Sequence, residues 1–256
     1  MSIEIERGLR DAGLSKGELV DVRRRLFLAR GLSLGAVTML TGCDMVTNTR
    51  PVDHLLRMIS RFNDGVQAAL FNPNRLAPTF PQSMVAPEFR FNAQYGFDKI
   101  PVLNPTTWRL QPSGLVSDKR AWTLDQLQAL PQRADVTRHV CVEGWSMIGE
   151  WGGVPLRDFL QKVGADLSAR YVSFHCDDPI NYTTSIDMPS ALHPQTILCL
   201  TYAGQPITAP FGAPMRVKIP TKLGFKQPKF VTEIRVTNEY PAGYWENYGY
   251  NWFAGL

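Results

Sequence analysis

The sequence predicts a mixed α+β fold in a single domain, and argues against a helical bundle or a doubly wound parallel sheet. The 19 prolines and 20 glycines among 256 residues indicate many turns and irregular connections. Strand-like and short helical segments alternate without the regular spacing of repeated β–α–β units. The length allows one hydrophobic core, and an aromatic content of 11% excludes intrinsic disorder for most of the chain.

The first expected helix covers residues 51–71, where Leu55, Ile59 and Phe62 recur at helical spacing. We expect an outer helix that packs on the body of the domain. Residues 72–105 are rich in Pro, Asn and Phe, which favours an extended and irregular chain.

The remaining elements are shorter. A helix over residues 123–130 begins at Thr123, a good N-cap, with Gln126 at the capping-box position. Another helix, residues 155–163, has Pro155 in its first turn. Runs of β-branched and aromatic residues predict strands at residues 108–110, 136–143, 171–176, 196–202, 215–219 and 230–236.

The first 43 residues have the layout of an export signal. Three arginines at positions 23–25 precede a short apolar run, residues 31–42, that is too short to span a membrane. The segment from Arg24 to Leu28 resembles the twin-arginine signal, which exports proteins already folded around a cofactor. Leu40 to Cys43 resembles a lipobox. We therefore expect a periplasmic protein, anchored to the membrane if Cys43 is lipidated.

The chain that follows this signal divides into two parts and is nearly balanced in charge. Residues 44–84 are expected to form the N-terminal helix and an irregular linker, and residues 85–256 the main domain. Residues 1–42 hold seven of the 27 basic and five of the 23 acidic residues, so the rest carries a formal net charge of +2. Because bulk nucleic-acid binding requires a basic face, we expect no nucleic-acid partner.

One stretch of the main domain is basic throughout. No Asp or Glu occurs from Met188 to Thr232, a stretch that contains Arg216, Lys218, Lys222, Lys226 and Lys229. Free backbone N–H groups near several cations suit a phosphate group, which arginine binds in bidentate fashion. On composition alone, a solvated basic face is an equal alternative.

Cys141 is the candidate for metal ligation. It lies near the end of an expected strand that runs into a turn containing Gly144, and alternation places His139, Cys141 and Glu143 on one face. A free cysteine more often behaves as a small buried hydrophobe. An exported protein exposes an unpaired cysteine to oxidation, however, and coordination to a metal would hold it as a thiolate.

These segments resemble a known family. The stretch from Cys141 to Met147, followed by Trp151 to Leu156, is similar to the molybdenum-ligand segment of the sulfite oxidase-fold molybdopterin-dependent oxidoreductases. Residues 212–229 resemble the pterin-phosphate segment of the same family, and residues 243–252 resemble its C-terminal tail. The resemblance covers roughly residues 85–256 and is strongest to the catalytic subunits of periplasmic protein-methionine-sulfoxide reductases.

The resemblance implies a mixed-sheet, sulfite oxidase-like fold and a molybdopterin cofactor with one molybdenum. It implies that the Cys141 thiolate binds the metal, a role suited to a soft ligand. The residues that it implies around the cofactor are Asn92, Tyr95, Gly96, Cys176, Phe211, Arg216, Gln227, Pro228 and Lys229. Arg216 and Lys229 would hold the terminal phosphate.

The implied reaction is a two-electron oxygen-atom transfer that reduces an S-oxide or N-oxide, free or bound to a protein. The implied electron donor is a membrane haem protein or a periplasmic cytochrome. One alternative is a sulfite-oxidising dehydrogenase of the same fold. Another is a non-catalytic exported lipoprotein that binds an anionic ligand in the basic stretch.

Three positions depart from the reductase pattern. Val140 stands where the family carries arginine, which changes the charge near the metal and puts the substrate in doubt. Cys176 and Phe211 stand where threonine and asparagine are common, which weakens particular cofactor hydrogen bonds. The chain has no room for the dimerisation domain of sulfite-oxidising members, so we expect a monomer.

Overall fold

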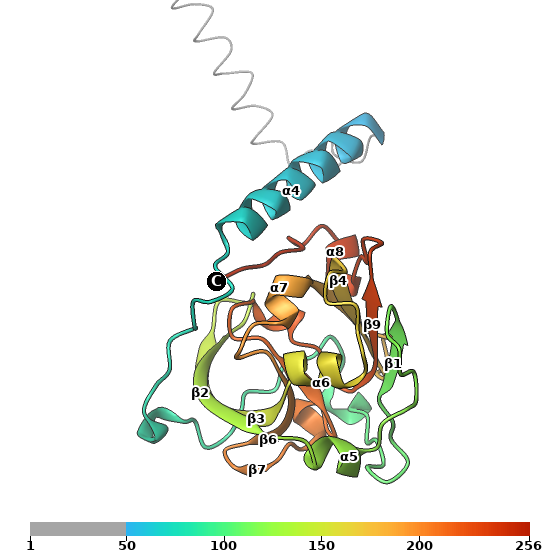
Figure 1. Cartoon of the computed structure of the whole chain (residues 1–256). Coiled ribbons are helices and arrows are strands. Elements are labelled where there is room, and N and C mark those ends of the chain that lie inside the picture. Colours follow the sequence, from blue (N-terminus) through green and yellow to red (C-terminus); the bar gives the residue numbers. More distant parts are fainter. Residues whose placement is uncertain (1–49) are drawn as a thin grey trace, which may run out of the picture. The chain divides into compact units, whose positions relative to one another are not determined.

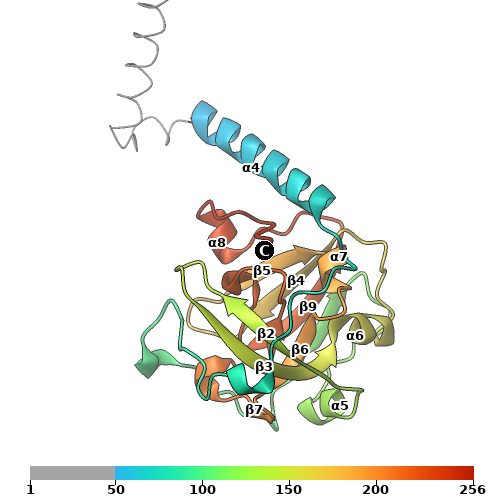
Figure 2. The same ribbon diagram turned by 90° about the vertical axis from the view of Figure 1, so that its left-hand side faces the viewer.

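The computed structural model describes residues 50–256 (Figures 1 and 2). The expected export signal and lipobox lie outside these residues. Contacts divide the chain into two units, Met1–Ile59 and Ser60–Leu256, and the second unit contains both sheets. Within residues 50–256, no helix combines the length and the apolar composition needed to cross a bilayer.

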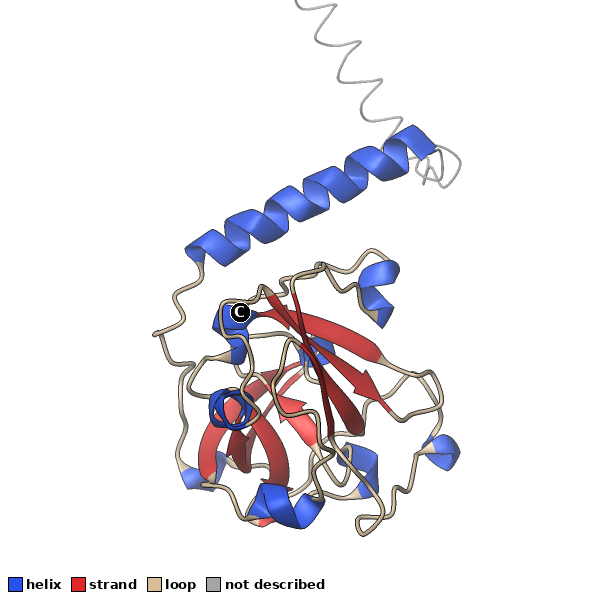
Figure 3. Ribbon diagram, turned by 45° about the vertical axis from the view of Figure 1, so that its right-hand side comes forward, coloured by secondary structure: helices blue, strands red, loops and turns tan. Residues whose placement is uncertain are grey.

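Two sheets form the framework of the second unit, as Figure 3 shows. The first sheet has the strand order β1-β9-β4-β5, in which β1 runs parallel to β9 and the other neighbours are antiparallel. Its strands are β1 (Gln111–Gly114), β4 (Tyr171–Cys176), β5 (Thr183–Asp187) and β9 (Val231–Thr237).

The second sheet is antiparallel and has the order β2-β3-β6-β7, with β8 also paired to β6. Its strands are β2 (Arg133–Val140), β3 (Ser146–Pro155), β6 (Ile197–Tyr202), β7 (Gln205–Pro206) and β8 (Arg216–Lys218). The two sheets and the short helices confirm the predicted mixed α+β class.

Helices are few and mostly short. The α-helices are α4 (Arg50–Leu70), α5 (Leu124–Gln128), α6 (Leu156–Lys162), α7 (Met188–Ala191) and α8 (Tyr244–Asn247). The single-turn 3₁₀ helices are η1 (Gln82–Met84), η2 (Phe97–Lys99), η3 (Ala209–Phe211) and η4 (Gly224–Lys226). The capping box predicted for α5 is present, since the Thr123 side chain accepts from the Gln126 backbone and the Gln126 side chain accepts from the Thr123 backbone.

The main core lies between the two sheets, because its members come from both. It contains Val154, Leu198, Leu200 and Val217 from the second sheet and Val172, Phe174, Val231, Ile234 and Val236 from the first. Alternation along β6 sends Ile197 and Cys199 to the opposite face, where they join an aromatic cluster around Phe89, Trp151 and Tyr202. This second cluster packs beside the candidate site.

One predicted strand does not form, another was wrong at its ends, and strands β1, β3, β5 and β7 were not predicted. Residues 108–110 form no strand, because Leu110 makes one isolated bridge to Trp122 and the ladder with β9 begins at Gln111. The strand expected to reach residue 143 ends at Val140. Strand β3 escaped prediction because it carries three glycines, which disfavour strands in general. Gly153 is required there, since a Cβ would lie 1.9 Å from the Leu198 carbonyl oxygen at the β-bulge.

The expected packing of the first helix on the body was also wrong in one respect. Within the second unit, the apolar side chains of Phe62, Val66 and Leu70 are exposed, whereas Asp64 is buried. The helix therefore contacts this unit through a polar residue and not through the apolar stripe that identified it.

Candidate active site

A single cavity brings together distant segments of the chain. It holds about 920 Å³ of space, its open mouth included. Its walls come from residues 89–95, 139–143, 178–182 and 224–229, from Arg216, and from Trp245 and Tyr250 in the C-terminal tail. Of the residues singled out by sequence, Asn92, Tyr95, Cys141, Arg216, Gln227, Pro228 and Lys229 line it.

Cys141 reaches the cavity from a tight turn directly after β2. Its backbone N–H donates to the Trp145 carbonyl at 2.9 Å, and the Gly144 N–H donates back to the Cys141 carbonyl at 3.2 Å. Gly144 has a φ of +88°, a conformation that favours glycine. His139, Cys141 and Glu143 all line the cavity, but a turn brings them together and not the expected alternation along one strand.

Among residues 50–256, the Cys141 thiol has one hydrogen-bonded side-chain partner. The Asn92 amide Nδ2 donates to the Cys141 Sγ at 2.9 Å, across 49 residues of sequence. Burial raises the pKa of the Cys141 thiol, whereas this hydrogen bond acts in the opposite direction by favouring the thiolate. A cation bound to the sulfur would oppose the effect of burial, so the position suits a metal-bound thiolate better than a free nucleophile.

Arg216 and Lys229 form a cationic end of the same cavity. Arg216 is 2% exposed, and its guanidinium donates to the carbonyls of Phe211 and Gln227 at 3.3 and 3.2 Å. Lys229 Nζ donates to the carbonyls of Asn92 and Pro210 at 2.6 and 3.3 Å. Within residues 50–256, neither cation forms a salt bridge to a carboxylate, and the Arg216 Nε has no hydrogen-bond partner.

Desolvation without a salt bridge disfavours both charges, although the charge of Asp178 acts in the opposite direction on Lys229. Desolvation lowers the pKa of Arg216 to about 10 and that of Lys229 to about 7, the proximity of Arg216 adding to the effect on Lys229. Buried charges are normally paired, so this end of the cavity matches an anionic group that protein side chains do not supply. A terminal phosphate fits this requirement.

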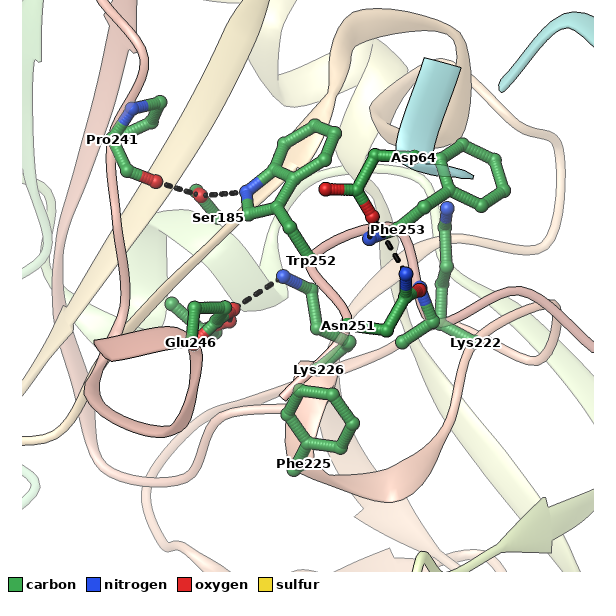
Figure 4. Close-up of polar contacts among 12 residues, drawn as sticks. Asp64, Ser185, Lys222, Phe225, Lys226, Pro241, Glu246, Asn251, Trp252 and Phe253 are labelled. Atoms are coloured by element: carbon green, nitrogen blue, oxygen red, sulfur yellow. Dashed lines mark hydrogen bonds and ion pairs between the residues drawn. The ribbon is translucent and has the colours of Figure 1, made fainter. Parts of the chain in front are cut away.

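The other three cations of the basic stretch lie elsewhere, and none is solvated. Lys218 Nζ lies 5.0 Å from the centre of the Trp151 ring, and Lys222 Nζ 3.0 Å from that of Phe253. Lys226 forms a buried ion pair with Glu246 (Figure 4). The alternative of a solvated basic face is therefore wrong.

His139 and Gln227 connect the two ends of the site. The His139 Nδ1 lies 3.3 Å from the Gln227 Oε1, and the Gln227 amide donates to the Lys222 carbonyl at 2.9 Å. Burial and the nearby Lys218 and Arg216 lower the pKa of His139 well below its usual value. His139 is therefore neutral at pH 7 and fixes the orientation of the Gln227 amide beside the cations.

Three residues implied by the resemblance do not line the cavity. Gly96 precedes η2, just beyond Tyr95. Cys176 is buried in the main core, where burial raises the pKa of its thiol well above the usual value. The Phe211 ring packs on Phe89 with 5.6 Å between ring centres, and its carbonyl oxygen accepts from Arg216. Any effect of these residues on the cofactor would be indirect.

Other lining residues carried weaker sequence signals. Trp245 and Tyr250 belong to the aromatic tail, in which sequence could not separate core residues from cleft residues. Asp178 forms the expected turn, accepting from the backbone of Ile180 and Tyr182, yet it also faces the cavity. Phe225 gave no signal, because an aromatic residue in a glycine-containing loop has no distinctive pattern.

The structure predicts that anion binding depends on the protonation of Lys229. In protein free of cofactor, sulfate affinity should fall by up to about tenfold per pH unit above 7, because the charged amine binds the anion and is lost as pH rises through its pKa. Isothermal titration calorimetry at pH 6–9 measures this, and sulfate itself does not titrate in that range.

Two matched lysine variants test whether the Lys229 amine is the group that causes this pH dependence. Lys229→Met should remove the pH dependence. Lys222→Met should retain it, although burial also lowers the pKa of Lys222 to about 7, since Lys222 does not line the cavity. A Lys229→Met protein with the full pH dependence would contradict the assignment.

Comparison with known proteins agrees with this geometry. Residues 97–245 match the family described as the oxidoreductase molybdopterin-binding domain, and this chain belongs to that family. It is therefore an oxidoreductase whose cofactor is molybdopterin.

Individual relatives show which members of the family this chain is similar to. The chain is 53% identical to the "Putative protein-methionine-sulfoxide reductase subunit YedZ1" of Azospira oryzae, over 98% of this chain and 95% of the relative. It is 34% and 33% identical to the protein-methionine-sulfoxide reductase catalytic subunits MsrP of Burkholderia mallei and Ralstonia nicotianae, over 58% and 56% of this chain. These matches span about half of each MsrP chain, 49% and 47%.

A solved structure supports the fold. The sulfane dehydrogenase SoxCD of Paracoccus pantotrophus matches with a TM-score of 0.52 and 19% identity, over 55% of this chain and 40% of that one. At this identity the match concerns the sulfite oxidase-like fold, as the resemblance predicted.

The residues present fit the cofactor. Buried Arg216 and partly buried Lys229, neither of which forms a salt bridge within residues 50–256, match the charge of a phosphate, and the Cys141 thiol lies in the same cavity. Within residues 50–256, no three His, Cys, Asp or Glu side chains come together to hold a metal ion.

Proposed function

We propose that this chain is the catalytic subunit of an exported methionine-sulfoxide reductase with a cysteine-ligated molybdenum. One observation carries the proposal: the Cys141 thiol and the unpaired cations Arg216 and Lys229 open onto one cavity. The names of the relatives from Azospira and Burkholderia support protein-bound methionine sulfoxide as the substrate.

The two ends of the cavity would bind different parts of the cofactor. Arg216 and Lys229 would hold the terminal phosphate, the arginine by its fork of donors and the lysine as a point charge. Asn92 would hold the Cys141 sulfur in its thiolate form through the 2.9 Å hydrogen bond. When bound, the molybdenum–pterin group supplies two-electron oxygen-atom chemistry.

Aromatic side chains in the cavity wall suit the methyl and methylene groups of methionine sulfoxide, whose S=O group is polar. Phe225, Trp245 and Tyr250 contribute aromatic walls, and the rings of Trp245 and Tyr250 lie 5.0 Å apart. Aromatic faces accept a thioether and exclude water. The reduction takes up two electrons and two protons and releases the thioether and water.

The proposal places the enzyme in the periplasm, with a lipid on Cys43 as its anchor. The sequence layout of residues 1–43 supports this placement. A membrane haem protein or a periplasmic cytochrome would deliver the electrons one at a time, and the protein would act as a monomer.

Steady-state assays test the reaction. Full-length protein made with a working molybdopterin pathway should contain one molybdenum per chain and reduce methionine sulfoxide, free and in an oxidised protein, with a reduced viologen as electron donor. The same chain made without that pathway should show no turnover.

Two outcomes would reject the proposal. Turnover of sulfite without turnover of any sulfoxide would assign the chain to the sulfite-oxidising branch. Purified protein with a bound phosphate ligand and no molybdenum would favour a binding protein without catalysis.

A further inference from the structure

Helix α4 separates its apolar and polar residues sharply. Leu55, Ile59, Phe62, Val66 and Leu70 follow one another at intervals of three or four residues, and all five side chains are exposed. Phe62 is 70% exposed and Leu70 80%. Five large apolar side chains along one face of a helix form a surface that a soluble protein normally covers.

The second unit holds this helix by its opposite side. Asp64 is 7% exposed, and its carboxylate accepts from the Asn251 side chain at 2.7 Å and from the Phe253 backbone at 3.1 Å (Figure 4). Arg61, three residues earlier on the same side, lies over the Tyr240 ring at 4.9 Å. The contact with the body thus leaves the apolar face free within this unit.

We propose that α4 lies in the interfacial region of a lipid bilayer, with its apolar face among the acyl chains. A strongly segregated helix with low overall hydropathy, arginines on its polar side and Phe and Leu on the other is typical of a helix that lies on a membrane. Its composition excludes a membrane-spanning role.

The chain before α4 favours lipid over another protein as the occupant. Cys43, the expected lipidation site, precedes the helix by seven residues, a reach of about 25 Å when extended. A lipobox cysteine carries a diacylglyceryl group, which would hold the start of α4 within this reach of the bilayer. The apolar face of α4 would then add a second contact with the lipid to that of the anchor.

This inference rests on the membrane placement proposed above but not on the reaction. A membrane-bound α4 would hold the enzyme near the bilayer through Asp64 and Arg61. It would thereby favour electron delivery from a membrane partner.

Hydrogen exchange with mass spectrometry on the full-length holoenzyme tests the contact locally. With vesicles of phosphatidylcholine and phosphatidylglycerol, amides of residues 50–70 should exchange at least about tenfold more slowly than without vesicles. Peptides from the two sheets should show no change. Phe62→Glu should abolish the effect, because it places a charge in the lipid-facing stripe.

The matched control is Ala68→Glu, which adds the same charge at an exposed position on the other side of α4. It should retain the protection, and both variants should keep sulfoxide turnover because α4 does not line the cavity. Unchanged exchange in α4 while the protein still sediments with vesicles would overturn the inference but leave the reaction and the anchor intact. Protection that appears without vesicles and rises with protein concentration would also overturn it, assigning the face to a second copy of the chain.

Discussion

Replacing Cys141 by serine is expected to lower sulfoxide turnover by more than about 100-fold, because loss of a group that merely supports a metal ligand already costs 10–100-fold. A hydroxyl is a harder and far more basic ligand than a thiolate, so it would not reproduce the bond to a soft metal. The pterin should stay at least partly bound, since Arg216 and Lys229 at the other end of the cavity are unchanged.

The measurement combines turnover with molybdenum and pterin content. Cys199→Ser is the matched control, because Cys199 is equally a buried free cysteine but lies outside the cavity. Its Sγ donates to the Thr201 carbonyl at 3.3 Å, a contact that a hydroxyl can also make. Full activity of Cys141→Ser would remove this cysteine from the mechanism.

Replacing Arg216 by methionine is expected to weaken cofactor binding by about 10–150-fold, the equivalent of one hydrogen bond to a charged group. Purified protein should then contain little pterin and should lose the thermal stabilisation that a tightly bound cofactor provides. Arg216→Lys should fall between the two, because it keeps the charge but not the paired donors of the guanidinium.

Lys218→Met provides the comparison for this prediction. Lys218 lies two residues further along β8 and is as deeply buried as Arg216, but it contacts the Trp151 ring and not the cavity. We expect near-normal pterin content in this variant. Equal loss of pterin from both variants would show that buried charge on β8 matters for folding and that Arg216 has no specific role in holding the phosphate.

Local elements were predictable where their cause is local. The capping box at Thr123 and Gln126 depends on residues three apart, and the structure confirms it. Strands β4, β6 and β9 were predicted to within a residue or so, because each carries a run of β-branched and aromatic residues buried between the sheets. Strand β3 failed because its glycines are explained by the close approach of β6, a contact that sequence patterns do not encode.

The sequence predicted which chemical groups belong to the candidate site better than it predicted how those groups are arranged in space. Residue types identified Cys141 and the basic stretch, and the family resemblance added Asn92. The pairing of Asn92 with Cys141 joins residues 49 apart, and the aromatic part of the cavity wall includes residues from the C-terminal tail. Nothing in the local sequence distinguishes Trp245 from a core tryptophan.

The sequence by itself determined the fold class, the family and the stock of chemical groups, because these depend on composition, periodicity and motif order. Only the tertiary structure decided which cations serve the site. Lys226 is neutralised by Glu246 and Lys222 lies over Phe253, whereas within residues 50–256 buried Arg216 and partly buried Lys229 form no salt bridge. The physical reason is that the partner next to a buried cation determines whether that cation is free to bind a ligand. Here those partners come from distant parts of the chain, so only folding brings them together.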